Sequence, residues 1–140
     1  MGNVQIKEMN KMLYLCNGKS EAMKQDPNMK DIPYSLTEEE FRNIILNAEF
    51  TSIIGHEKLA NCLTKITGKK IVYNRKSITL RYNDEVIVVY LTGRLPENPS
   101  FVEYKNRINY SYIRFEKQSQ SDMLQSLVRI KEITKIKEEI

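Results

Sequence analysis

The segment DEVIVVYLTG, from Asp84 to Gly93, constrains the fold more than any other part of this chain. Its apolar run is continuous rather than alternating, which favours a strand that is buried on both faces. We therefore predict that this segment is a central strand. Strands and helices intermix along the rest of the chain, which is typical of the α/β class.

The remaining segments predict further strands and helices around this strand. Short apolar runs or alternating patterns predict strands at 12–17, 51–54, 70–74, 77–80 and 109–117. Apolar residues at helical spacing predict helices over 35–50, 56–68 and 119–140. A capping signal opens the first helix, and Gly68 is suited to end the second. We expect one domain over residues 1–140, with a mixed β-sheet of about five strands, helices on both faces and a C-terminal helix.

Composition narrows the classes of partner. The formal net charge is +4 and the pI is about 9.0, which favours an anionic, phosphate-bearing ligand. The two cysteines, Cys16 and Cys62, form no CxxC or Cys/His motif, so no metal site is predicted. No apolar stretch approaches the roughly 18 residues that span a bilayer, and the N-terminus does not resemble a signal peptide. We expect an intracellular protein that does not enter a membrane and keeps its thiols reduced.

Polar residues follow the ends of several predicted strands. These residues are Asn17, Ser20, His56, Asn74, Arg75, Arg94 and Glu97. In open α/β sheets, ligands bind beyond the carboxyl ends of the strands. If these ends meet at one edge, the site combines two arginines and amides with a glutamate and the chain's single histidine. Such a set suits phosphate binding with one proton-transfer group.

The chemistry open to this set is limited. It lacks the carboxylate cluster of a typical metal site, and the chain has no Gly-rich Walker loop for nucleotide hydrolysis. Cleavage of an RNA phosphodiester requires less, because the ribose 2′-OH can attack its own phosphorus. Arginine can offset the charge of the phosphorane, and histidinium can protonate the departing 5′ oxygen. A glutamate near the imidazole would favour the charged form and fix its orientation.

Four motifs in order, N-x-x-S, IGHE, NR and GRLPE, resemble those of the viral ring nucleases. These are anti-CRISPR proteins of archaeal viruses and bacteriophages that degrade cyclic tetra-adenylate. The resemblance spans residues 12–97, whereas the strand and C-terminal helix over residues 109–140 have no counterpart in it. It implies that His56 is the general acid and that Glu97 supports it. It also implies that Arg75 and Arg94 hold the phosphate and ribose of the ligand.

The same resemblance implies the remaining contacts and the biological role. Asn17 and Ser20 fall on positions that line the ring-binding pocket. The family acts without metal or other cofactor, as a homodimer that binds one ring across its two-fold axis, and no long nucleic acid is expected as a partner. Its products are linear diadenylates that end in 2′,3′-cyclic phosphate. The reaction suppresses type III CRISPR signalling in the cytoplasm of a prokaryotic cell.

Two other functions fit the same residues. A protein that sequesters a cyclic nucleotide or a nucleic acid would use the same arginines, with His56 as a hydrogen-bond donor only. A protein that acts by protein contact would depend on the C-terminal helix over residues 119–140 instead.

Overall fold

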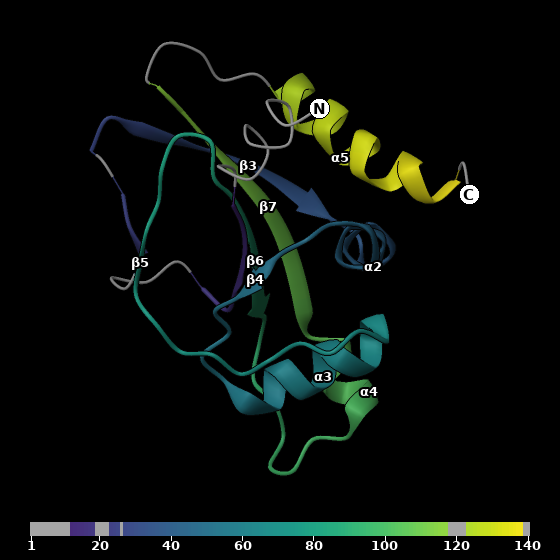
Figure 1. The fold of residues 1–140 in the computed structure, drawn as a ribbon. Helices are drawn as coiled ribbons and strands as arrows, with labels where there is room; N and C mark the ends of the chain where they lie inside the picture. Colours follow the sequence, from purple (N-terminus) through teal and green to yellow (C-terminus); the bar gives the residue numbers. More distant parts are fainter. Residues whose placement is uncertain (1–11, 19–22, 26, 118–122, 139–140) are drawn as a thin grey trace.

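The computed structural model describes residues 12–18, 23–25, 27–117 and 123–138 (Figure 1). The strands are β1 (Leu13–Cys16), β2 (Met23–Lys24), β3 (Met29–Leu36), β4 (Thr51–Ser52), β5 (Ile78–Thr79), β6 (Glu85–Leu91) and β7 (Ile108–Lys117). The helices are α2 (Glu38–Asn47), α3 (Glu57–Thr67), α4 (Phe101–Lys105) and α5 (Met123–Glu138). Five strands form one sheet in the order β3-β7-β6-β1-β4, and β2 pairs with β5. The predicted mixed α/β architecture is confirmed.

Strand β6 lies at the centre of the sheet, as its apolar run predicts. It pairs in parallel with β1 and antiparallel with β7. Ile87 and Val89 are buried on one face, and Val86 and Val88 are buried on the other. The continuous run is therefore explained by burial on both faces.

The strand directions bring several chain segments to one edge. Strands β1, β4 and β6 run parallel, so their carboxyl ends meet at the same edge of the sheet. Strand β7 runs the opposite way, with Ile108 opposite Leu91, so β7 begins at this edge. Residues that follow β1, β4 and β6 therefore become neighbours of residues that precede β7.

The described helices lie on one face of the sheet. One core cluster receives Phe41 from α2, Leu63 from α3, Tyr104 from α4 and Ile130 from α5. Residues that pack on the other face form a second cluster: Cys16, Met29, Ile53, Leu80, Val86, Val88 and Phe115. Figure 1 shows α2 and α5 on one side and the β2–β5 pair on the other.

This placement differs from the expectation of helices on both faces. Within the described ranges, the second face is covered by β5 and the segment after it. Leu80 is buried there, with Ile78 and Tyr82 packed against the same cluster.

Helix boundaries follow their capping residues. The capping box of α2 uses Thr37 and Glu40, so residues 35 and 36 end β3 rather than begin the helix. Helix α3 ends at Gly68, whose φ of 76° is the left-handed conformation expected of a C-terminal cap. The helices predicted over 35–50 and 56–68 are therefore confirmed as α2 and α3, with these limits.

Strand β3 and helix α4 were not predicted from the sequence. Strand β3 contains Pro33, which argues against a central strand. It is an edge strand, paired with β7 alone, where a missing N–H is tolerated. Helix α4 spans five residues and begins at a second capping box, Ser100 with Glu103. The predicted strand over 70–74 forms a single bridge, between Tyr73 and Ile54.

A buried polar cluster fastens α5 to the sheet. The Glu85 carboxylate on β6 is 3% exposed and accepts a hydrogen bond from the Tyr112 hydroxyl on β7. Arg129 on α5 donates from Nε and Nη2 to the two carboxylate oxygens, at 3.1 and 3.3 Å. Burial and the neighbouring carboxylate raise the pKa of Tyr112, so its hydroxyl remains a donor.

None of the helices in the described part of the chain combines the length and the apolar character that a membrane span requires.

Arg129→Ala should lower the free energy of unfolding by about 2–3 kcal/mol, because it leaves the Glu85 carboxylate buried without its cation. Lys131→Ala, an exposed change on the same helix, is the matched control and should shift it by less than about 0.5 kcal/mol. Urea denaturation of the three proteins measures both values. Equal stability of the Arg129 variant and the control would show that this cluster does not hold α5.

Candidate functional site

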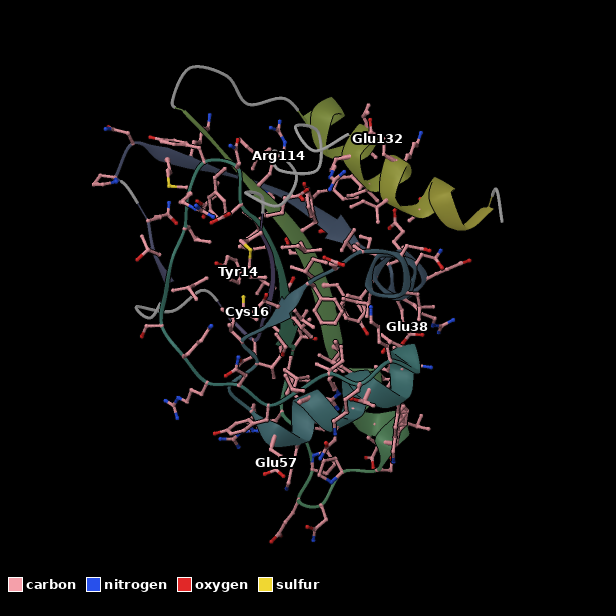
Figure 2. The ribbon with its side chains drawn as sticks, viewed as in Figure 1. Tyr14, Cys16, Glu38, Glu57, Arg114 and Glu132 are labelled. Carbon is pink, nitrogen blue, oxygen red and sulfur yellow. The ribbon has the colours of Figure 1, made fainter. Side chains whose placement is uncertain are left out.

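Three of the segments that carry the predicted site residues emerge at the shared sheet edge. Asn17 directly follows β1, His56 precedes α3 shortly after β4, and Arg94 follows β6. Figure 2 labels Glu57, the first residue of α3, at the lower end of the molecule. The loop between β6 and α4 runs at the same end (Figure 1). The predicted gathering of strand ends is thus observed for these three segments.

Asn17 and Asn74 hold the segment before His56 in place. The Asn17 side chain accepts a hydrogen bond from the Gly55 N–H, with Oδ1 2.9 Å from the nitrogen. Asn74 donates its N–H to the Ile54 carbonyl and its Nδ2 to the Ser52 carbonyl, both at 2.9 Å. These bonds therefore hold the end of β4 and the residues after it, and His56 follows directly.

Arg75 lies against the same segment. A Cβ atom at position 55 would lie 3.3 Å from Arg75 Cγ and 3.6 Å from its Cβ and Cδ. The aliphatic part of Arg75 thus packs on Gly55, while the residue as a whole is exposed. Gly55 allows this close approach because it has no side chain. Arg75 consequently packs on the residue that directly precedes His56.

His56 is the N-cap of α3, and its imidazole is exposed. Its Nδ1 accepts the Leu59 N–H at 3.4 Å. Nε2 is then the ring nitrogen left to bond a ligand. The histidine serves the helix in the way that Ser, Thr, Asp or Asn usually does.

Arg94 occupies a loop that is anchored on both sides. Gly93 before it has a φ of 75°, and Leu95 after it packs against the core. The Arg94 carbonyl accepts a hydrogen bond of 2.6 Å from Nη1 of Arg107, and the Arg94 residue is exposed. Sequence reasoning missed Arg107. Its position just before the strand predicted over residues 109–117 was the available signal, and the structure adds that β7 begins where β6 ends.

The structure gives no support for the predicted roles of the other two residues, Glu97 and Ser20. Glu97 is exposed and forms no hydrogen bond or ion pair with any residue that the structure describes. Its support of His56 therefore stays a prediction. Ser20 lies outside the described residues, and its role stays a prediction as well.

The two cysteines are not activated nucleophiles. Cys16 directly precedes Asn17, and burial raises the pKa of its thiol to about 11, against a weaker opposite effect from the Gly18 backbone. Burial also raises the pKa of Cys62. Both thiols are therefore protonated at neutral pH. Among the described residues, no group of three or more His, Cys, Asp or Glu could hold a metal ion.

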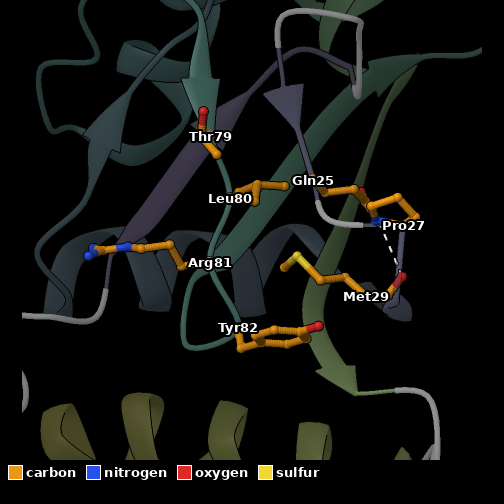
Figure 3. Close-up of a pocket in the computed structure, with 7 residues that line it drawn as sticks. All are labelled: Gln25, Pro27, Met29, Thr79, Leu80, Arg81 and Tyr82. Carbon is orange, nitrogen blue, oxygen red and sulfur yellow. Dashed lines mark hydrogen bonds between the residues drawn. The ribbon is translucent and has the colours of Figure 1, made fainter.

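A pocket of about 530 Å³ lies elsewhere (Figure 3). Its lining residues are Gln25, Pro27, Met29, Thr79, Leu80, Arg81 and Tyr82. These residues adjoin the start of β6, whereas the strand-end residues follow its end, roughly 20 Å away along the seven-residue strand. The lining contains neither a histidine nor a carboxylate. The strand-end residues, and not this pocket, are therefore the candidate site.

The fold and the strand-end residues define a small mixed α/β protein with an exposed, arginine-bearing site at one sheet edge. This chain belongs to the STIV B116-like family, whose family model matches residues 13–112. A protein of Sulfolobus islandicus filamentous virus (isolate Iceland/Hveragerdi), "Uncharacterized protein 26", is 33% identical over 107 residues, which cover 75% of this chain and 91% of the relative.

A solved structure gives the same fold. B116 of Sulfolobus turreted icosahedral virus matches with a TM-score of 0.60 and 22% identity, over 74% of this chain and 98% of that chain. The family and both relatives are viral, which agrees with the resemblance to the viral ring nucleases. Helix α5 lies outside the residues matched by the family.

The pKa of Cys16 predicts a loss of stability at alkaline pH. Because the folded state keeps this thiol protonated above its ordinary pKa of 9.0, its contribution to stability is complete below pH 9 and is lost as the pH rises towards about 11. The free energy of unfolding, measured by urea denaturation from pH 8 to 11, should therefore fall across this range. Cys16→Ala should reduce the slope without abolishing it, because Tyr110 and Tyr112 also have raised pKa values. An unchanged slope in the variant would contradict the assignment.

Proposed function

We propose that this protein is a metal-independent ring nuclease that cleaves cyclic tetra-adenylate into linear diadenylates ending in 2′,3′-cyclic phosphate. The reaction would suppress type III CRISPR signalling in the cytoplasm of the infected cell. One observation carries the proposal: Asn17 and Arg75, which are 58 positions apart in the sequence, both contact Gly55 directly beside the single histidine. Membership of a viral family and the four ordered motifs support it further.

The proposed reaction divides the work among few groups. The ribose 2′-OH attacks its own phosphorus, loses its proton to solvent and forms the cyclic phosphate. The bond from phosphorus to the 5′ oxygen breaks, and His56 gives that oxygen a proton. Arg75 and Arg94 offset the negative charge that builds on the phosphorane. No metal is needed for any of these steps.

His56 must leave its cap to act as the acid. An imidazolium carries a proton on both nitrogens, so Nδ1 can no longer accept the Leu59 N–H. Release of the cap frees this N–H at the start of α3, where a helix terminus favours an anion. A phosphate of the ring is therefore a suitable replacement for the imidazole at this position.

A homodimer fits the proposed substrate. A ring of four identical nucleotides can have two-fold symmetry, and a two-fold dimer presents the same groups twice. His56, Arg75 and Arg94 are all exposed in the single chain, so they are accessible to a ring held between two copies. Two copies of His56 would then face two opposite linkages.

The cleavage of cyclic tetra-adenylate can be tested directly in the presence of EDTA. The protein is incubated with cyclic tetra-adenylate, with cyclic hexa-adenylate and with a linear RNA, and the products are resolved by chromatography. We expect loss of the four-membered ring and appearance of diadenylate with a cyclic phosphate. An intact ring that co-elutes with the protein would identify a sequestering protein. Neither binding nor cleavage would reject both functions.

Replacement of His56 can separate catalysis from capping. Asn is a good N-cap but cannot transfer a proton, so His56→Asn should retain the thermal midpoint and ring binding. Its single-turnover cleavage rate should fall about 100-fold or more. His56→Ala should lose the same activity and some stability of α3.

Lys58→Ala, an exposed change on the same helix, is the matched control and should cleave at the wild-type rate. Wild-type cleavage by His56→Asn would show that the histidine is not the acid.

The alternative function is sequestration of a cyclic nucleotide or a nucleic acid without cleavage. The cap hydrogen bond favours it, because a histidine that keeps Nδ1 bonded to Leu59 offers only Nε2 to a ligand. In that case the wild-type protein and His56→Asn would both bind the ring and leave it intact.

A further inference from the structure

We propose that Arg107 is a positioning residue for Arg94, and that it orients the loop through which Arg94 meets an anionic ligand. This inference rests on the proposed function, since it concerns the same strand-end site. Arg107 lies just before β7 and outside the four motifs that suggest the activity.

Arg107 holds the end of β6 with both its main chain and its side chain. Its carbonyl accepts the Thr92 N–H at 2.8 Å, which extends the β6–β7 pairing beyond Leu91. Its Nη1 reaches past Gly93 and donates to the Arg94 carbonyl at 2.6 Å. Asn109 adds a bond of 3.0 Å from Nδ2 to Thr92 Oγ1. Arg107 therefore holds this turn at two points, the Thr92 N–H and the Arg94 carbonyl.

Gly93 is matched to this arrangement. Its φ of 75° is a conformation that other residues rarely adopt. A Cβ atom at this position would also lie 2.8 Å from Arg107 Nη1, which is too close for two unbonded heavy atoms. The glycine thus serves the turn and leaves room for the guanidinium beside it. Gly93 and Arg107 should respond to substitution as a coupled pair.

The charges point to an anion at this turn. Neither Arg94 nor Arg107 forms an ion pair with a carboxylate among the described residues. The Arg107 guanidinium lies against the turn that carries Arg94, so a phosphate bound at this turn could be contacted by both arginines. A carbonyl that is held in place also reduces the freedom that Arg94 loses when it binds. The arrangement is consistent with a loop that is organised before the ligand arrives.

The experiment uses the full chain with His56→Asn as the parent, so that cyclic tetra-adenylate binds without being cut. The dissociation constant of the ring is measured by calorimetric titration for the parent and for four variants made in it. These variants are Arg94→Ala, Arg107→Ala, the double variant that carries both alanines, and Arg107→Lys. Arg107→Ala should weaken binding about tenfold, as expected for loss of a hydrogen bond from a charged donor. If Arg107 acts through Arg94, the double variant should bind within about threefold of Arg94→Ala alone. Arg107→Lys should recover part of the loss.

Arg81→Ala in the same parent is the control, because it removes one exposed cation beyond the other end of β6. It should leave the dissociation constant within about twofold of the parent. Equal binding by Arg107→Ala and the parent would overturn the proposal. Additive losses in the double variant would also overturn it, because they would make Arg107 an independent ligand contact.

A second measurement does not depend on the ring. Gly93→Ala should destabilise the chain less in the Arg107→Ala background than in the wild type, because in the wild type the added methyl group displaces the Arg107 guanidinium from its bond to the Arg94 carbonyl. Urea denaturation of the four proteins gives this difference. If the His56→Asn parent does not bind the ring, the proposed function is rejected. If Gly93→Ala lowers the free energy of unfolding equally in both backgrounds, the contact between Arg107 and the turn is rejected.

Discussion

The parallel pairing of β1 with β4 and β6 is the constraint on which the site depends. Parallel strands end at the same edge, so the register of β1 places Asn17, the Gly55–His56 step and the Arg94 loop together although they are far apart in sequence. The Asn17 bond to the Gly55 N–H converts this coarse proximity into a defined geometry. Three parallel strands that are each followed by polar residues therefore provide the candidate site without any insertion in the fold.

The two ends of β6 are built for different purposes. At its start, Glu85 is buried, satisfied by Tyr112 and Arg129, and ties an additional helix to the sheet. At its end, Arg94 is exposed in a loop with Gly93 at a positive φ. The same strand thus connects a region where polar groups are fully paired inside the protein to one where arginines face solvent. Helix α5 lies outside the residues matched by the family, whereas Glu85 and Tyr112, to which it is anchored, lie within them.

The sequence predicted the elements whose patterns were strong. The apolar run of β6, the helical spacing of Phe41 and Ile44 in α2, and the Gly68 cap of α3 each reflect local physics, and each is confirmed. Strand β3 was not predicted because Pro33 is acceptable only in an edge strand, and edge position is a tertiary property. The role of Arg107 was not predicted for the same reason, since its bond to the Arg94 carbonyl depends on how β6 and β7 pair.

His56 shows how one side chain can serve stability and chemistry in turn. As an N-cap it satisfies an N–H that the first turn of α3 leaves unpaired. As a proposed acid it must be protonated on both nitrogens, which removes that acceptor. The two states exclude each other, so a ligand that binds the freed N–H would favour the protonated imidazole. A phosphate can do so, and its negative charge beside the ring would stabilise the imidazolium. If the proposed function holds, the substrate itself would prepare the acid, and the cap would keep the histidine in place until the substrate arrives.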